Sequence, residues 1–144
     1  MNIFIASDHA GVSAKAEVLK VLETMECVYQ DIGPFSQDIP VDYPLYARAV
    51  AKEVLTTPHS LGILLCGSGT GMAMAANKVR GIRAALCYDE YSAMMARYDN
   101  DANILCLRVR EFNHELYPQI IKAFLLTEFS NLERHKRRIS KLEK

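Results

Sequence analysis

The segment Leu61–Lys78, LGILLCGSGTGMAMAANK, places a cysteine and three alternating glycines at the end of an apolar run. Leu61–Leu65 predicts a buried strand that ends at Cys66, and Met72–Lys78 predicts a helix rich in alanine and methionine. The glycines of Gly67–Gly71 allow backbone conformations that other residues avoid. Backbone N–H groups in a turn that leads into a helix N-terminus can bind an anion. The sequence therefore predicts an anion-binding loop with a thiol at its edge.

Several chemistries use a loop of this kind, and Met72 argues against three of them. A nucleotide-binding P-loop needs Lys and then Ser or Thr after its last glycine, and G-x-G-x-x-G needs a third glycine at residue 72. A cysteine phosphatase would have an arginine there to hold phosphate. A thiol at a helix N-terminus favours the thiolate, which can remove a proton beside a carbonyl while N–H groups hold the oxyanion. Enolisation is therefore one interpretation, and a tight turn around a packed Cys66 is the other.

The elements that would position these residues alternate between strand and helix patterns. Strands are predicted at Asn2–Ala6, Cys27–Ile32, Leu61–Cys66, Arg83–Cys87 and Asn103–Leu107. Helices are predicted at Gly11–Met25, Tyr43–Leu55, Met72–Lys78 and Glu90–Tyr98, with further helices from about Asn113. Strands that alternate with helices indicate an α/β fold in which a five-stranded parallel sheet is covered on both faces.

Ligands of such a sheet bind beyond the carboxyl ends of its strands. Polar residues follow four of the five predicted strands, at Ser7–His9, Cys66–Gly71, Tyr88–Asp89 and Arg108–Arg110. These ends bring together an acid, a histidine, a thiol, a glycine loop and arginines. The sequence therefore predicts a polar site at this edge of the sheet.

The composition restricts the class of protein. The 144 residues fit one domain, 1–144, and the 17 basic and 17 acidic residues cancel, so we expect no nucleic-acid partner. No apolar run approaches the roughly 20 residues of a membrane span, and no basic, apolar leader begins the chain, so we expect a cytoplasmic protein without a membrane partner. The four cysteines lack C-x-x-C spacing, which indicates reduced thiols. Charge is uneven along the chain, and Arg134–Lys144 holds six Lys or Arg and one acid.

Six motifs in order carry a resemblance to a known family. They are SDHAG, DYP at Asp42–Pro44, CGSGTGMAMAANK, GIRAA, NDAN at Asn100–Asn103 and RHKRR at Arg134–Arg138. Together they resemble the ribose-5-phosphate isomerase B family, which includes the galactose-6-phosphate isomerase subunits. The resemblance implies a Rossmann-like three-layer α/β/α sandwich with a C-terminal helical extension, no metal, no cofactor, and interconversion of an aldose phosphate with its ketose. It also implies a homodimer or tetramer with a shared active site, the tail from about residue 128 packing on a partner subunit.

The resemblance also implies a role for each matching residue. Cys66 matches the base that moves a proton between carbons 1 and 2 through a cis-enediolate, and Ser68 a hydroxyl that assists this transfer. Asp8 matches an acid that handles sugar hydroxyls, and Tyr43 lines the sugar pocket. The anion hole corresponds to Gly67, Ser68, Gly69, Thr70 and Gly71, and further substrate contacts to Asn100. The phosphate grip corresponds to His9, Arg110, Arg134 and Arg138.

Two positions depart from the family pattern. Asp99 stands where members commonly have a histidine that opens the furanose ring, and Arg108 replaces a usual glycine. A carboxylate is a weak general acid at neutral pH, so we expect activity with a weakened ring-opening step. A six-carbon sugar phosphate, or a non-catalytic module that binds sugar phosphates, remains an alternative. His135, between basic residues, is expected to face either phosphate or solvent.

Overall fold

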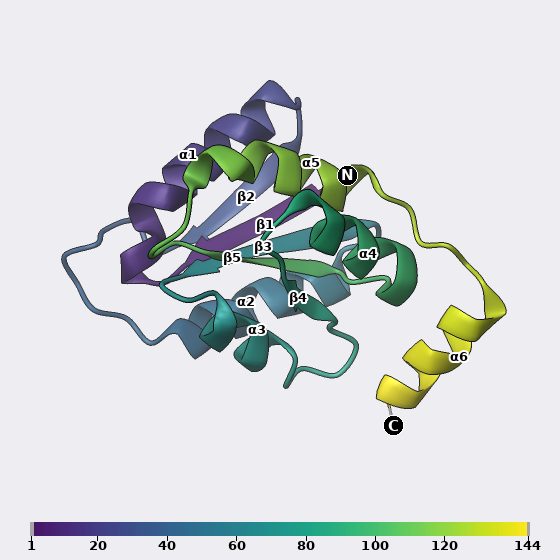
Figure 1. Cartoon of the computed structure of the whole chain (residues 1–144). Coiled ribbons are helices and arrows are strands. Elements are labelled where there is room, and N and C mark those ends of the chain that lie inside the picture. The colour runs from purple at the N-terminus through teal and green to yellow at the C-terminus, as the bar shows by residue number, and fades with distance from the viewer. Residues whose placement is uncertain (1, 144) are drawn as a thin grey trace.

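Five parallel strands form a single sheet in the computed structural model, which describes residues 2–143 (Figure 1). The strands are β1 (Asn2–Ser7), β2 (Val28–Gly33), β3 (Ser60–Cys66), β4 (Ala84–Leu86) and β5 (Ile104–Arg108), in the spatial order β2-β1-β3-β5-β4. All five predicted strands are confirmed, with ends that differ by at most one residue. Their carboxyl ends lie at one edge, as required for the predicted site.

Helices cover both faces of the sheet, which confirms the three-layer α/β/α arrangement (Figure 1). One face carries α1 (Val12–Thr24), α4 (Glu90–Asn100) and α5 (Tyr117–Leu126), and the other carries α2 (Tyr43–Thr56) and α3 (Thr70–Ala76). Two short 3-10 helices, η1 (His9–Gly11) and η2 (His114–Leu116), precede α1 and α5. Helix α3 begins and ends two residues earlier than the sequence predicts.

Strand β3 lies at the centre of the sheet, and all seven of its residues are buried. Because side chains alternate along a strand, Ile63 and Leu65 pack under α1 and α5, while Leu64 and Cys66 face α2 and α3. This burial on both sides explains why the run reads as continuously apolar. The strand therefore delivers Cys66 to the edge of the sheet on a rigid support.

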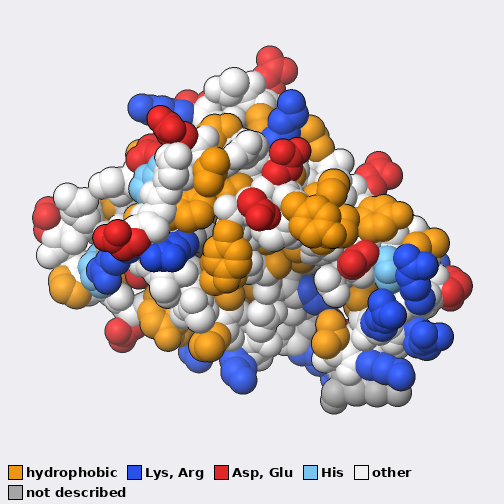
Figure 2. Space-filling model, viewed as in Figure 1, with side chains coloured by type: hydrophobic (Ala, Val, Ile, Leu, Met, Phe, Trp, Pro, Cys, Tyr) orange, Lys and Arg blue, Asp and Glu red, His pale blue; other side chains and the backbone are white. Residues whose placement is uncertain are grey.

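The tail leaves the three layers after α5 and ends in α6 (Glu133–Leu142), which projects away from the sheet and contacts α4 (Figure 1). A contact between Arg83 Nη1 and Glu143 Oε1, 3.2 Å apart, ties the end of α6 to the segment before β4. Basic side chains gather over α6 (Figure 2). None of the described helices combines the length and the hydrophobicity that crossing a bilayer requires.

Candidate active site

A cleft of about 550 Å³ opens at the carboxyl ends of β1, β3 and β5. It is lined by Asp8, His9, Tyr43, Cys66, Gly67, Ser68, Thr70, Gly71, Leu86, Tyr88, Arg108 and Arg110. The strand order places β3 between β1 and β5, so residues far apart in the sequence converge here. Most of the site residues predicted from the sequence thus lie around one cavity.

Cys66 is the last residue of β3 and is only 4% exposed. The Gly69 N–H donates to the Cys66 Sγ over 3.1 Å and also lies 3.2 Å from the Cys66 carbonyl oxygen. Gly69 has a φ of 76°, and a Cβ there would collide with Leu86, so glycine is required. The turn therefore directs a backbone N–H donor at the sulfur.

The other two glycines let side chains approach the loop closely. A Cβ on Gly67 would lie 3.2 Å from the Nε of Arg110, and one on Gly71 would lie 2.9 Å from the Cζ of Tyr43. The Arg110 N–H also donates to the Gly67 carbonyl oxygen over 2.9 Å. The loop is thus enclosed between a guanidinium on one side and an aromatic ring on the other.

Asp8 and His9 border the cleft from the end of β1. The Asp8 Oδ1 accepts from the Gly11 N–H over 3.0 Å, which caps η1 and fixes the carboxylate. The Nδ1 of His9 accepts from the Val41 N–H over 3.3 Å, so the proton of the neutral ring lies on Nε2. An imidazole N–H and a carboxylate are therefore held side by side at the cleft.

The cleft carries more positive than negative charge. Arg108 and Arg110 both line it, and within residues 2–143 neither forms an ion pair with a carboxylate. The Arg108 Nε donates to the Arg110 carbonyl oxygen over 2.6 Å, which fixes its side chain at the rim. The only carboxylate among the lining residues is Asp8. This balance suits an anionic ligand.

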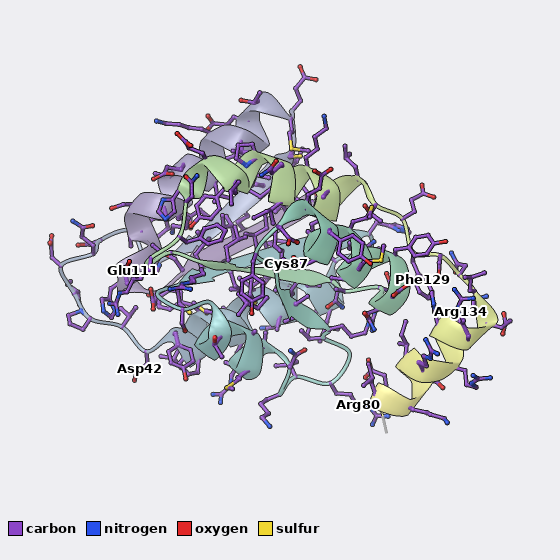
Figure 3. All side chains as sticks on the ribbon, viewed as in Figure 1. Asp42, Arg80, Cys87, Glu111, Phe129 and Arg134 are labelled. Carbon is purple, nitrogen blue, oxygen red and sulfur yellow. The ribbon has the colours of Figure 1, made fainter. Side chains whose placement is uncertain are left out.

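Five residues of the predicted set are not among the lining residues of this cleft: Gly69, Asp99, Asn100, Arg134 and Arg138. Gly69 still lies in the loop beside it, where its N–H contacts the Cys66 Sγ. Asn100 borders a separate cavity of about 670 Å³ between residues 77–85 and the end of α6. In Figure 3, Asp42 and Glu111, next to the lining residues Tyr43 and Arg110, lie on the opposite side of the molecule from Arg134. One chain alone therefore does not assemble the complete set.

His135 does not have the environment that the sequence suggests. Its side chain is 3% exposed and packs against α4, so the expectation of a residue facing phosphate or solvent is wrong. The reason is a contact with Ser130 and Asp99, which sequence periodicity does not reveal.

Other residues near the site have structural roles. Asp89 caps α4: its Oδ1 accepts from the Ser92 N–H over 2.7 Å, and these hydrogen bonds lower the pKa of Asp89 from its ordinary 3.8. Burial raises the pKa of the Cys87 thiol to about 12 and that of Cys106 well above its ordinary value, so both are inert. The described residues contain no group of three metal-ligating side chains.

Sequence reasoning missed one lining residue, Leu86, and one buried ion pair. Tyr88 and Arg108, which the strand ends place at this edge of the sheet, also line the cleft, although the sequence assigned neither a role. Lys15, 3% exposed, binds Asp31 Oδ1 over 2.6 Å and the Pro34 carbonyl oxygen over 2.8 Å. This pair fixes the start of the loop that leads to Val41, whose N–H contacts His9.

The chain resembles known proteins over almost its full length. The model of the ribose/galactose isomerase family matches residues 3–142. Ribose-5-phosphate isomerase B of Mycolicibacterium paratuberculosis is 39% identical over 139 residues, which cover 96% of this chain and 87% of that protein. The solved type B ribose 5-phosphate isomerase of Trypanosoma cruzi has a TM-score of 0.94 and 42% identity, covering 99% of this chain and 96% of that one. The Thermotoga maritima ribose 5-phosphate isomerase has a TM-score of 0.94 and 45% identity, with 99% and 97% covered.

Proposed function

The chain belongs to the ribose/galactose isomerase family, and from this premise we propose that it interconverts ribose 5-phosphate and ribulose 5-phosphate through an enediolate, without a metal. The observation that carries the proposal is the hydrogen bond from the Gly69 N–H to the Cys66 Sγ at the edge of a cationic cleft. The bond directs a backbone donor at the sulfur of the proposed base, and this sulfur adjoins a loop that can hold an oxyanion.

In the proposed reaction, the Cys66 thiolate removes the proton from carbon 2 of the open-chain aldose. The negative charge moves to the carbonyl oxygen, and a cis-enediolate forms. Free N–H groups of Gly67–Gly71, including those of the first turn of α3, stabilise this oxyanion. Return of the proton from Cys66 to carbon 1 gives the ketose. Ser68 assists the transfer of protons between the two oxygens.

The remaining cleft residues orient the sugar. Asp8 accepts hydrogen bonds from the sugar hydroxyls, and the Tyr43 ring, packed on Gly71, forms a wall of the pocket. His9 and Arg110 bind the phosphate at the other end of the substrate. A phosphate fixed there holds the reacting carbons over Cys66, which lowers the entropic cost of the reaction.

We propose that a second copy of the chain completes each site. Arg134 and Arg138 lie four residues apart on α6, so both can reach one phosphate. They do not line the cleft of their own chain, and α6 projects away from the sheet (Figure 1). A two-fold homodimer, alone or within a tetramer, would bring them, with Asp99 and Asn100, to the partner's cleft. Asp99 would then act on the sugar ring.

The decisive experiment is an assay of purified protein with ribose 5-phosphate, allose 6-phosphate and galactose 6-phosphate, in the presence of EDTA. We expect the highest kcat/KM on ribose 5-phosphate, and a loss of about 100- to 10,000-fold for Cys66→Ala. Higher activity on a six-carbon substrate would correct the substrate. Binding without conversion would indicate a non-catalytic module, and near-normal activity of the variant would rule out Cys66 as the base.

A further inference from the structure

The buried imidazole of His135 connects α6 to Asp99. Its Nδ1 lies 2.6 Å from the Ser130 Oγ, while its Nε2 lies 3.0 Å from the Arg134 Nε and 3.5 Å from the Asp99 Oδ1. The Ser130 N–H donates to the Tyr98 carbonyl oxygen over 3.0 Å, and the Tyr98 ring meets the imidazole edge-on. The ring is therefore fixed from both sides, next to a residue of proposed catalytic importance.

The two neighbours of Nε2 require opposite protonation states of this nitrogen. An arginine Nε can only donate a hydrogen bond, whereas a carboxylate can only accept one. An unprotonated Nε2 therefore accepts a hydrogen bond from Arg134, whereas a protonated Nε2 donates one to Asp99. Ser130 can accept from Nδ1–H in both states, so only the proton on Nε2 changes. His135 can thus pair with Arg134 or with Asp99.

Exposure separates the roles of the two partners. The Asp99 side chain is 45% exposed and can contact a ligand, whereas the His135 side chain is 3% exposed and cannot. Arg134 is also exposed, and in the proposed function it binds the phosphate in the partner's cleft. When the phosphate engages Arg134, Nε2 loses that donor and becomes available to Asp99.

We propose that His135 is a positioning residue for ring opening: it orients the Asp99 carboxyl and returns a proton to it once Arg134 has bound the substrate's phosphate. The inference rests on the proposed function. In this step the bond between C1 and the ring oxygen breaks, Asp99 gives a proton to that oxygen, and the C1 hydroxyl loses its proton to water as the aldehyde forms. Asp99 then recovers a proton from Nε2, and His135 regains one from solvent.

The test separates ring opening from enolisation. Ribose 5-phosphate is mainly a furanose and must open, whereas ribulose 5-phosphate is open-chain. Conversion of ribose 5-phosphate therefore reports both steps, and incorporation of deuterium from D₂O into carbon 1 of ribulose 5-phosphate reports enolisation alone. We expect His135→Gln to slow conversion at least about 10-fold and to leave deuterium incorporation within about 2-fold of wild type. Glu133→Gln, an exposed change on the same helix, should alter neither rate.

A second variant makes the test independent of any damage to the tail. Asp99→His restores a ring that can exchange protons by itself, so the double variant Asp99→His/His135→Gln should convert ribose 5-phosphate faster than His135→Gln. Equal loss of conversion and deuterium incorporation in His135→Gln would show a merely structural role and overturn the inference. Unchanged conversion, or no rescue in the double variant, would also overturn it. If wild type converts no ribose 5-phosphate, the proposed function itself fails.

Discussion

A site shared between two chains can be tested by combining two damaged copies in one dimer. Cys66→Ala removes the proposed base, and Arg138→Ala removes one of the phosphate ligands proposed for the tail. If Cys66 and Arg138 of one site come from different chains, a heterodimer of the two variants contains one intact site and one site that lacks both groups. If they come from the same chain, each of the two sites in the heterodimer lacks one group.

The expected activities follow from this geometry. Loss of a general base costs about 100- to 10,000-fold, and loss of one charged hydrogen bond of about 1.5–3 kcal/mol costs roughly 10- to 150-fold in kcat/KM. Each homodimer should therefore retain less than about 10% of wild-type activity at low substrate concentration. A heterodimer with one intact site of two should have about 50%.

The two chains would carry different affinity tags, be co-expressed, and be purified by both tags in turn. The matched control pairs a wild-type chain with a chain that carries both substitutions. For a shared site this control has no intact site and should be nearly inactive, whereas for a site within one chain it should have about 50% activity and the first heterodimer almost none. The second result would refute the assignment of the tail to the partner's cleft.

The other predictions concern the thiols, the α4 cap and the buried ion pair. Alkylation with iodoacetamide at neutral pH should modify Cys66 at the cleft and inactivate the enzyme. Cys87 should stay unmodified in mass spectrometry, because burial raises its pKa to about 12. Inactivation without modification of Cys66 would contradict this prediction. The lowered pKa of Asp89 means that its charge stabilises the fold above pH 3.8 and that this contribution is lost on further acidification. Wild type should therefore have a slightly higher Tm than Asp89→Asn at pH 6, and the difference should vanish in acid. Asp31→Ala should lower the free energy of unfolding in urea by about 3–5 kcal/mol, because it leaves Lys15 buried without its carboxylate; a loss below about 1 kcal/mol would refute this reasoning.

The sequence predicts the sheet well because each strand is a local apolar run between helical patterns. The same locality explains the cleft: residues after β1, β3 and β5 must meet once the strands are parallel. The contacts of His135 and Lys15 cannot be inferred from local patterns, because their partners Asp99 and Asp31 lie in other elements. A histidine among basic residues and a lysine on a helix are usually exposed. Here the packing of α6 on α4 buries His135, and the packing of α1 beside β2 buries Lys15.

The hydrogen bonds of the glycine loop support the proposal that it holds an enediolate and not a phosphate. A phosphate cradle directs several successive N–H groups outward at one anion, usually at the start of a long helix. Here the Gly69 N–H points to the Cys66 Sγ, the Thr70 N–H lies 3.3 Å from the Ser68 Oγ, and α3 has only seven residues. The few remaining donors match the small, transient charge on one carbonyl oxygen. In the proposed reaction the doubly charged phosphate has stronger partners in guanidinium groups, such as that of Arg110, because two parallel N–H donors match its oxygens.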